Sequence, residues 1–311
     1  MCYAGTMNAS SERLPTISIG LPALNEEANI KILIEQILRQ RIVSGTLIEI
    51  LVMSDGSTDS TIAQAASVGD PRIKLFDFKE RRGKYAIENE IFSHSTGDIM
   101  CIFDCDVLLA NDSVIEKLIE PIVADRTVGI VGADIYPAEP KNFFESIMAE
   151  SHKIKTDIYR TINHSDTMYL CHGRGRAFNR ALYPTLKWLE GYPEDAFSYF
   201  ACMEKGFKFV YAPEARVIFR SPTHFKDHVR QDSRYISGKK RMEEYFGREK
   251  VKQVYHIPFW SYVWGIGKHM MTSPIRTISY CVMTFYLWFL APGKKVYKTM
   301  WDVSESSKRV Q

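Results

Sequence analysis

The chain of 311 residues lacks the features that mark several common classes of protein. Its 40 basic and 37 acidic residues leave a net charge of +3, which gives no strongly basic surface of the kind that binds nucleic acid. Its six cysteines include no Cys-x-x-Cys pair, and this favours reduced, buried thiols in a cytosol-facing protein over a disulfide framework or a zinc site. The first 15 residues contain no apolar segment, so we expect no signal peptide.

What the chain does contain is an alternation of apolar strand patterns with helical patterns. The predicted strands cover residues 16–21, 48–53, 73–76, 99–103 and 128–132, and the predicted helices cover residues 26–40, 57–67, 84–94 and 112–124. Nearly continuous apolar strands are typical of parallel sheets that are buried on both faces. The alternation therefore predicts an α/β fold with a doubly wound, mainly parallel sheet, whose ligands bind at the carboxyl ends of the strands.

The second half of the chain has a less regular pattern. We expect a long helix, a glycine–arginine segment, a shorter helix, two paired strands and a polar helix, at residues 142–162, 173–176, 194–205, 208–212 with 216–220, and 225–246. No repeat or low-complexity linker separates these segments from the first half. We therefore predict one catalytic domain over residues 16–250, preceded by a tail of residues 1–15.

The last fifth of the chain is rich in aromatic residues. Residues 277–293 carry no charge, but this run is at the short limit of the ~20 residues that a spanning helix needs. Basic residues flank it on both sides, among them Lys268, Arg276 and Lys294, which favours a monotopic or re-entrant segment with both ends on the cytoplasmic face over a single crossing. A single spanning helix and a buried helix of a soluble domain are the alternatives. We predict membrane-associating helices over residues 251–293 and a basic tail over residues 294–311.

Two acidic residues follow the fourth predicted strand. Asp104 and Asp106 stand two positions apart, so on an extended chain they point to the same side. Two close carboxylates repel each other unless a cation lies between them. Mg²⁺ or Mn²⁺ prefers such oxygen ligands, and water and substrate phosphates would complete its coordination. The alternative is that one carboxylate caps the next helix while the other faces water.

The polar loops follow one another in a recognisable order. These loops are P-x-x-N-E at residues 22–26, S-D-G-S-T-D at 54–59, G-K at 83–84, the G-D-I-x-x-x-x-D-x-D stretch at 97–106, C-H-G-R-G-R-A-F at 171–178, P-E-D at 193–195 and Q-D-S-R-Y at 231–235. The set resembles the family 2 glycosyltransferases of the GT-A fold, and its last motif resembles the Q-x-x-R-W of polysaccharide synthases. The resemblance covers residues 16–235.

The resemblance implies a role for each matching residue. Asp195 would be the general base, in an acidic pair with Glu194, while Gln231 and Arg234 would hold the diphosphate. The nucleotide-sugar site would be formed by Pro22, Leu24, Glu26, Asp55, Lys84, Asp104, Gly173, Arg174 and Tyr235, the last of which would also offer an aromatic face to the acceptor. Asp106 would bind the divalent cation, Mg²⁺ or Mn²⁺, directly, and Asp104 would face the nucleotide side of the same ion.

The implied reaction is an inverting, metal-dependent transfer of a sugar, as in polysaccharide biosynthesis. The donor would be a nucleotide-diphosphate sugar, a UDP-sugar first of all, and the acceptor a hydroxyl of a lipid-linked or membrane-proximal glycan. Tyr235 in place of tryptophan and Leu24 in place of an aromatic residue depart from the family pattern. One or two short apolar segments build no export channel, so we expect transfer of one or a few sugars, with a membrane partner protein as the alternative.

Two rival functions are weighed against this reaction. A sugar-1-phosphate nucleotidyltransferase would need a glycine-rich, basic loop after the first strand, where residues 20–26 of this chain include one glycine, no basic residue and the acidic Glu26. The second rival is a membrane-peripheral nucleotide-sugar-binding protein without activity. The joint presence of Asp104, Asp106, Asp195 and Arg234 favours the enzyme.

Overall fold

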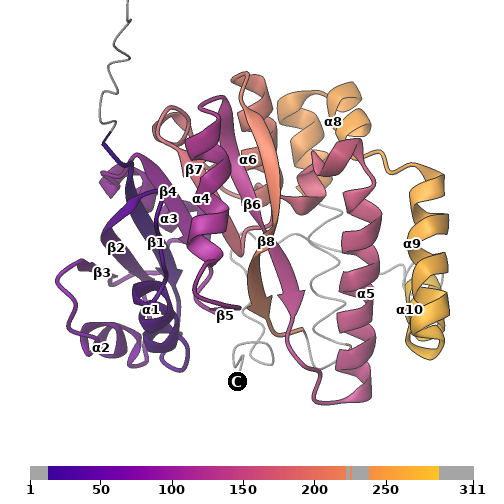
Figure 1. Ribbon diagram of the computed structural model, residues 1–311, viewed down its shortest axis with the longest axis horizontal. Helices are drawn as coiled ribbons and strands as arrows, with labels where there is room; N and C mark the ends of the chain where they lie inside the picture. Colours follow the sequence, from indigo (N-terminus) through magenta and orange to yellow (C-terminus); the bar gives the residue numbers. More distant parts are fainter. Residues whose placement is uncertain (1–12, 222–224, 226–237, 287–311) are drawn as a thin grey trace, which may run out of the picture.

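The computed structural model describes residues 13–221, 225 and 238–286, and its centre is an eight-stranded sheet (Figure 1). The strand order is β3-β2-β1-β4-β7-β6-β8-β5. The strands are β1 (Thr16–Ala23), β2 (Thr46–Asp55), β3 (Ile73–Phe78), β4 (Ile99–Phe103), β5 (Val107–Leu109), β6 (Val128–Pro137), β7 (Gly175–Asn179) and β8 (Lys208–Phe219). The first four in space are parallel, while β7 runs antiparallel between β4 and β6. Asp55 and Asp104 therefore lie at the same edge of the sheet.

Helices cover both faces of the sheet, which confirms the α/β class. They are α1 (Ile30–Leu38), α2 (Thr61–Ala66), α3 (Lys84–His94), α4 (Val114–Ala124), α5 (Phe143–Arg160), α6 (Glu194–Glu204) and α8 (Arg248–Val254). One core packs α1 and α4 against the sheet through Leu33, Ile34, Ile115 and Leu118. The other packs α3 and α6 against the opposite face through Ile87, Ile91, Phe197 and Phe200. The first two, α1 and α4, are amphipathic, since their apolar side faces a strand surface.

Several predicted elements need correction. The second half of the glycine–arginine segment, Gly175 and Arg176, begins a strand, β7, in the middle of the sheet. The expected pair of strands after residue 207 is one strand, β8, whose register with β6 shifts between Ala212 and Arg216 so that three residues form a bulge. The predicted helix at residues 57–67 begins only at Thr61. Of the expected polar helix, residues 238–246 are helical and residues 226–237 lie outside the described chain.

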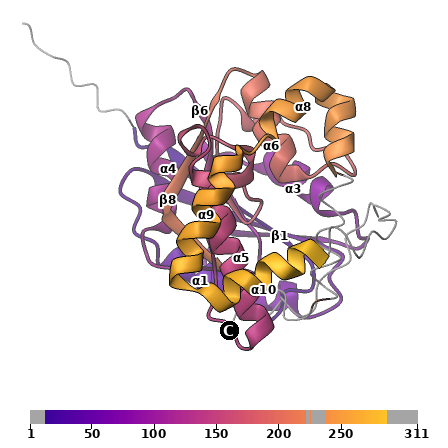
Figure 2. The same ribbon diagram turned by 90° about the vertical axis from the view of Figure 1, so that its right-hand side faces the viewer.

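Two further helices follow α8 and pack against α5 (Figures 1 and 2). These are α9 (Phe259–Thr272) and α10 (Pro274–Phe285), and we call them together the C-terminal hairpin. The helical conformation is interrupted between them at Ser273, because Pro274 has no N–H to continue the hydrogen bonds of α9. Within the described residues, no helix combines the length and the apolar character that crossing a membrane requires. Residues 287–293, the end of the predicted uncharged run 277–293, lie outside the described part.

Candidate active site

The loops after β1 and β2 are tied to each other at the carboxyl edge of the sheet. Asn25, with a φ of 53°, accepts a hydrogen bond from the Thr58 N–H at 2.8 Å on its side-chain oxygen. The Glu26 N–H in turn donates to Thr61 Oγ1 at 2.7 Å. The thiol of Cys105 donates to the Pro22 carbonyl at 3.2 Å. The loop that carries Pro22, Leu24 and Glu26 is therefore held beside the Asp104–Asp106 segment.

Asp55 fastens the end of β2 to the start of α3. Its two carboxylate oxygens accept hydrogen bonds from the backbone N–H groups of Arg82 at 2.6 Å and Gly83 at 2.9 Å. Gly56 makes this approach feasible, since it has a φ of +73° and a Cβ there would lie 3.0 Å from the Arg81 nitrogen. Asp55 is 4% exposed. Its carboxylate thus positions the segment that carries Lys84.

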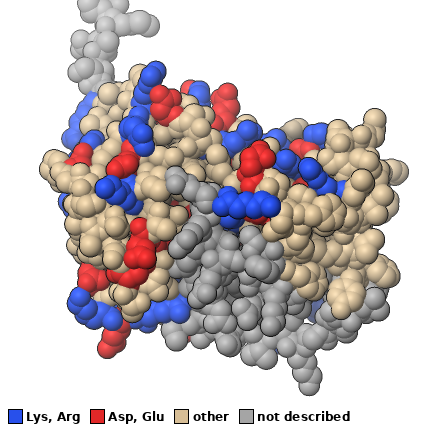
Figure 3. Space-filling view, turned by 90° about the horizontal axis from the view of Figure 1, so that it is seen from below, with Lys and Arg blue, Asp and Glu red and all other residues tan. Residues whose placement is uncertain are grey.

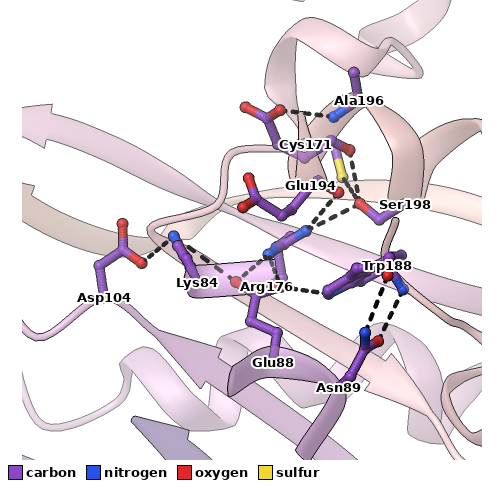
Figure 4. A network of polar contacts seen from close by, with 11 residues as sticks. Lys84, Glu88, Asn89, Asp104, Cys171, Arg176, Trp188, Glu194, Ala196 and Ser198 are labelled. Carbon is purple, nitrogen blue, oxygen red and sulfur yellow. Dashed lines mark hydrogen bonds and ion pairs between the residues drawn. The ribbon is translucent and has the colours of Figure 1, made fainter. Parts of the chain in front are cut away.

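Lys84 is the cation at the centre of the site (Figure 4). Its ammonium group lies 2.5 Å from Asp104 Oδ1 and 3.7 Å from Glu88 Oε1. Burial acts to lower the pKa of Lys84, but the negative charges of Asp104, Glu88 and Glu194 outweigh it and raise this pKa above its ordinary value. Lys84 is therefore charged in the site.

Asp106 lies near enough to Asp104 for the charge of one carboxylate to act on the other. Burial, followed by the charge of Asp104, raises the pKa of Asp106, while Arg174 and Lys84 oppose this shift. In the described chain, no group of three or more acidic, histidine or cysteine side chains gathers to form a metal site. Two hard carboxylates fit a divalent cation that takes its other ligands from phosphate and water.

The segment before β7 completes this side of the site. The Arg174 carbonyl accepts from the Asp104 N–H at 3.4 Å, which sets Arg174 next to the acidic pair. Its guanidinium lies over the Phe219 ring at 4.4 Å, and its buried Nε makes no hydrogen bond within the part of the chain that the structure describes. A Cβ at Gly173 would stand 3.4 Å from the Lys84 ammonium. Gly173 therefore leaves the space beside Lys84 open.

The acidic motif lies in the first turn of α6. Glu194 is buried, and this burial raises the pKa of its carboxyl to about 8 although Lys84 acts in the opposite direction. Asp195 is partly exposed, and its Oδ1 accepts the Ala196 N–H at 2.7 Å. Figure 4 shows Glu194 on the same side of the network as Lys84. Residues from α3, from the segment after β4 and from α6 thus meet in one place.

Three predicted site residues cannot be placed, and two charged residues next to the site were not predicted. Gln231, Arg234 and Tyr235 lie outside the described residues. Glu88 and Arg176 form a buried ion pair below the site at 3.1 Å. Glu88 stands four residues after Lys84 in a predicted helix, and this spacing was the one available signal that the two side chains face the same way.

Comparison of the sequence with known protein families identifies a relationship. The sequence model described as glycosyl transferase family 2 matches residues 18–185, which is more than half of the chain. Glucosyl-3-phosphoglycerate synthase of Mycobacterium tuberculosis is 32% identical over 120 residues, covering 37% of this chain and 36% of that protein. The 4,4'-diaponeurosporenoate glycosyltransferase of Staphylococcus aureus is 28% identical over 148 residues, covering 47% and 37%. The chain thus matches little more than a third of the length of these relatives.

Solved structures show the same fold. A mannosyltransferase from Pyrobaculum calidifontis, determined with GDP-Man and Mn²⁺, has a TM-score of 0.59 at 20% identity, covering 90% of this chain and 82% of that one. Mannosyl-3-phosphoglycerate synthase from Rubrobacter xylanophilus has a TM-score of 0.53 at 15% identity, covering 75% and 76%. The chain belongs to glycosyl transferase family 2, and its fold is GT-A.

Proposed function

We propose that this enzyme transfers a sugar from a nucleotide-diphosphate sugar to an acceptor hydroxyl with inversion, and that Asp195 is the general base. The observation that carries this proposal is the meeting of Lys84, Asp104 and the first turn of α6 in one site. Asp195 would take the proton of the acceptor hydroxyl as its oxygen attacks the anomeric carbon, and the nucleoside diphosphate would leave. One displacement without an enzyme nucleophile turns an α-linked donor into a β-linked product.

The donor would bind along the carboxyl edge of the sheet. The loop of Pro22, Leu24 and Glu26, together with Asp55, would surround the nucleoside, and Lys84 would neutralise the diphosphate. Arg174 is suited to contact the donor as well, because its guanidinium lies beside Asp106 with an Nε that makes no hydrogen bond. Gln231 and Arg234 would add further contacts to the diphosphate. We take a UDP-sugar as the first candidate, to be compared with GDP-sugars.

Asp106, with Asp104, would hold Mg²⁺ or Mn²⁺. The support comes from the chemistry of the two carboxylates and from the Mn²⁺ in the Pyrobaculum calidifontis structure of the same fold. When bound, such a cation stabilises the charge that develops on the diphosphate leaving group. The Lys84 ammonium group now binds Asp104. When the donor binds, the phosphates would take over part of this contact.

The acceptor would be lipid-linked or membrane-proximal, reached from the cytoplasmic face. Support comes from the outer side of the C-terminal hairpin, where large apolar side chains are exposed: Phe259, Trp260, Met271, Ile275 and Val282 are 63–88% accessible. Figure 3 shows that the end of the molecule carrying these helices has few charged side chains over much of this face. Aromatic and aliphatic side chains of in-plane helices enter the interfacial region of a bilayer.

The inner side of the hairpin is fixed to the catalytic domain by charged groups. His269 lies between Glu150 at 2.7 Å and Asp157 at 3.0 Å, and Lys268 binds Asp157 at 2.6 Å. These contacts join α9 to α5. A hairpin that is fixed inward by ionic contacts and apolar outward fits a monotopic attachment, which would hold the active site close to a lipid-linked acceptor.

The test is a binding and turnover screen of the purified enzyme in mild detergent. Thermal shift and nucleotide release are measured with UDP-, GDP- and dTDP-sugars, with Mn²⁺, Mg²⁺ or chelator, for the wild type and for Asp106→Asn and Asp195→Asn. Asp112→Asn is the matched control, because Asp112 pairs with the exposed Arg41 away from the site. We expect one nucleotide sugar to stabilise the enzyme only with metal, and Asp195→Asn to bind it while turnover falls by about 10²–10⁴-fold.

The outcomes separate the rival functions. Binding without turnover in the wild type, across all acceptors offered, would leave a nucleotide-sugar-binding protein without activity. If no nucleotide sugar binds under any metal, the proposed donor class is wrong.

A further inference from the structure

Arg176 is the largest fully buried side chain among the described residues, and it carries a charge. It lies in the central strand β7, enclosed by the rings of Phe178 and Trp188. Moving a guanidinium out of water costs several kcal/mol, and an ion pair in the interior often stabilises a fold no better than apolar side chains would. Its Nε is also buried, with no hydrogen-bond partner among the described residues. Stability alone therefore gives a poor account of an arginine at this position.

One arm of the guanidinium binds helix α3. Nη2 of Arg176 donates to both carboxylate oxygens of Glu88, at 3.2 and 3.1 Å. Trp188 Nε1 donates to the same carboxylate at 2.6 Å, and Asn89 exchanges two hydrogen bonds with the backbone of Trp188 (Figure 4). Glu88 is thus fixed one helical turn after Lys84, whose ammonium group lies between Glu88 and Asp104.

The other arm binds the first turn of α6. Nη1 of Arg176 donates to the Glu194 carbonyl at 3.2 Å and to Ser198 Oγ at 3.0 Å. The Ser198 hydroxyl donates in turn to the Asp195 carbonyl at 2.7 Å. The backbone of both acidic residues is therefore held from below by one side chain and the hydroxyl next to it.

We infer that Arg176 is a positioning residue that fixes Asp195 relative to the donor-binding end of α3. One arm of its planar guanidinium binds Glu88, which lies next to Lys84 and through it to Asp104. The other arm binds the Glu194 carbonyl directly and reaches the Asp195 carbonyl through the Ser198 hydroxyl. This inference rests on the proposed function, in which Lys84 binds the donor and Asp195 activates the acceptor. A displacement of the base by about 1 Å can lower the rate by about 10²-fold, so a rigid connection of this kind matters for turnover.

Arg176→Lys is the decisive variant. Lysine keeps the charge that Glu88 needs, but a single ammonium group lacks the fork that reaches both helices. We expect kcat to fall by about 10- to 100-fold, while the donor KM stays near the wild-type value. The double variant Arg176→Met/Glu88→Met removes both charges together, so it leaves no unpaired ion and should fold. It should show the same loss of kcat.

The control is Glu49→Gln, which changes a buried, ion-paired carboxylate at the opposite edge of the sheet. Glu49 is 1% exposed and binds Lys74 at 2.6 Å. This variant should lose melting temperature with no change in kcat. Any merely structural role of Arg176 would produce the same pattern as this control.

Hydrogen exchange of the α6 peptide separates this inference from the proposed function. Arg176→Lys should speed exchange of the amides from Ser198 onward, while exchange in β2 and β4 stays as in the wild type. Unchanged exchange in α6 together with an unchanged kcat would overturn the inference. If the wild type turns over no nucleotide sugar, the proposed function fails, and the exchange result alone then decides whether Arg176 holds α6.

Discussion

The edge of the sheet and the C-terminal hairpin use apolar residues in opposite ways. In β4 all five side chains are buried, and the polar loops that follow β1, β2 and β4 are tied together by hydrogen bonds to backbone groups. In α9 and α10 most of the large apolar side chains face outward, while hydrogen bonds of His269 with Glu150 and Asp157 and the ion pair of Lys268 with Asp157 hold the inner side. Apolar composition therefore marks a core in one region and a contact surface in the other.

The largest effect that this comparison predicts is on stability, for one substitution made in each region. Phe103 is fully buried in β4, whereas Phe259 is 72% exposed in α9. Phe103→Ala should lower the free energy of unfolding by about 3–5 kcal/mol because it leaves a cavity. Phe259→Ala should change it by less than about 0.5 kcal/mol. Urea unfolding of the two variants measures both, and equal losses would show that the hairpin face is part of the core.

The parallel half of the sheet was predictable because its strands are apolar on both faces. The predicted strand 99–103 and the predicted helix 84–94 agree with β4 and α3 at both ends. Glycine and proline punctuation, with buried positions at helical spacing, was sufficient there. The predicted start of α2 was too early because the side chains of Ser57 and Asp59 bind the neighbouring loop. Ser57 Oγ accepts a hydrogen bond from the Asn25 N–H at 3.0 Å, and Asp59 Oδ2 accepts one from the Glu27 N–H at 3.2 Å.

The middle of the sheet was less predictable for a physical reason. β7 contains Arg176 between glycine and alanine, and a charged residue in a central strand contradicts the apolar pattern of such strands. Its partner Glu88 is 88 positions away in the sequence, so only the folded chain shows that the two charges neutralise each other. For the same reason the motif residues of the site could be named in advance, while the network that positions them could not.

The second prediction concerns the stability that the fold loses by burying the Glu194 carboxyl group. Glu194 has its pKa raised to about 8 by burial, whereas an unfolded glutamate ionises near 4.5. Between these values the folded chain keeps a proton that the unfolded chain releases, so the free energy of unfolding falls as pH rises. Glu194→Gln is neutral at every pH. It should melt close to the wild type at pH 5 and several degrees higher at pH 8, since about 1 kcal/mol corresponds to 2–4 °C.

The same substitution at Glu49 should act with the opposite sign. Burial acts to raise the pKa of Glu49, but the ion pair with Lys74 and hydrogen bonds from Ser18 and Thr96 outweigh it and lower the pKa to about 2. Its ionised form therefore stabilises the folded chain above pH 4.5, and Glu49→Gln should melt lower than the wild type at both pH 5 and pH 8. Differential scanning fluorimetry at the two pH values compares the variants. A Glu194→Gln variant that melts lower at pH 8 would contradict the buried, protonated carboxyl.

The third prediction returns to the hairpin, where the exposed face should bind lipid. Trp260 is 76% exposed, and so is Val43 in the loop after α1. Trp260→Ala should lose about 2 kcal/mol of vesicle binding, roughly 30-fold in the partition coefficient, because the indole no longer enters the interface. Val43→Ala should have no effect. Sedimentation with vesicles of mixed neutral and anionic lipids measures this, and a wild type that stays in the supernatant would remove the membrane from the proposal.

The smallest effect separates the charge of the hairpin from its apolar face. Arg276 is exposed in the first turn of α10, next to the apolar side chain of Ile275. A basic residue near an anionic bilayer contributes about 1 kcal/mol, so Arg276→Gln should weaken binding to anionic vesicles by about fivefold. The difference should vanish on neutral vesicles and shrink at high salt, because a Debye length falls to about 3 Å at 1 M ionic strength. Arg126→Gln, at an exposed position before β6, is the matched control. If both arginine variants lose binding equally, the attraction comes from the overall charge of the protein, and the hairpin has no privileged orientation toward the bilayer.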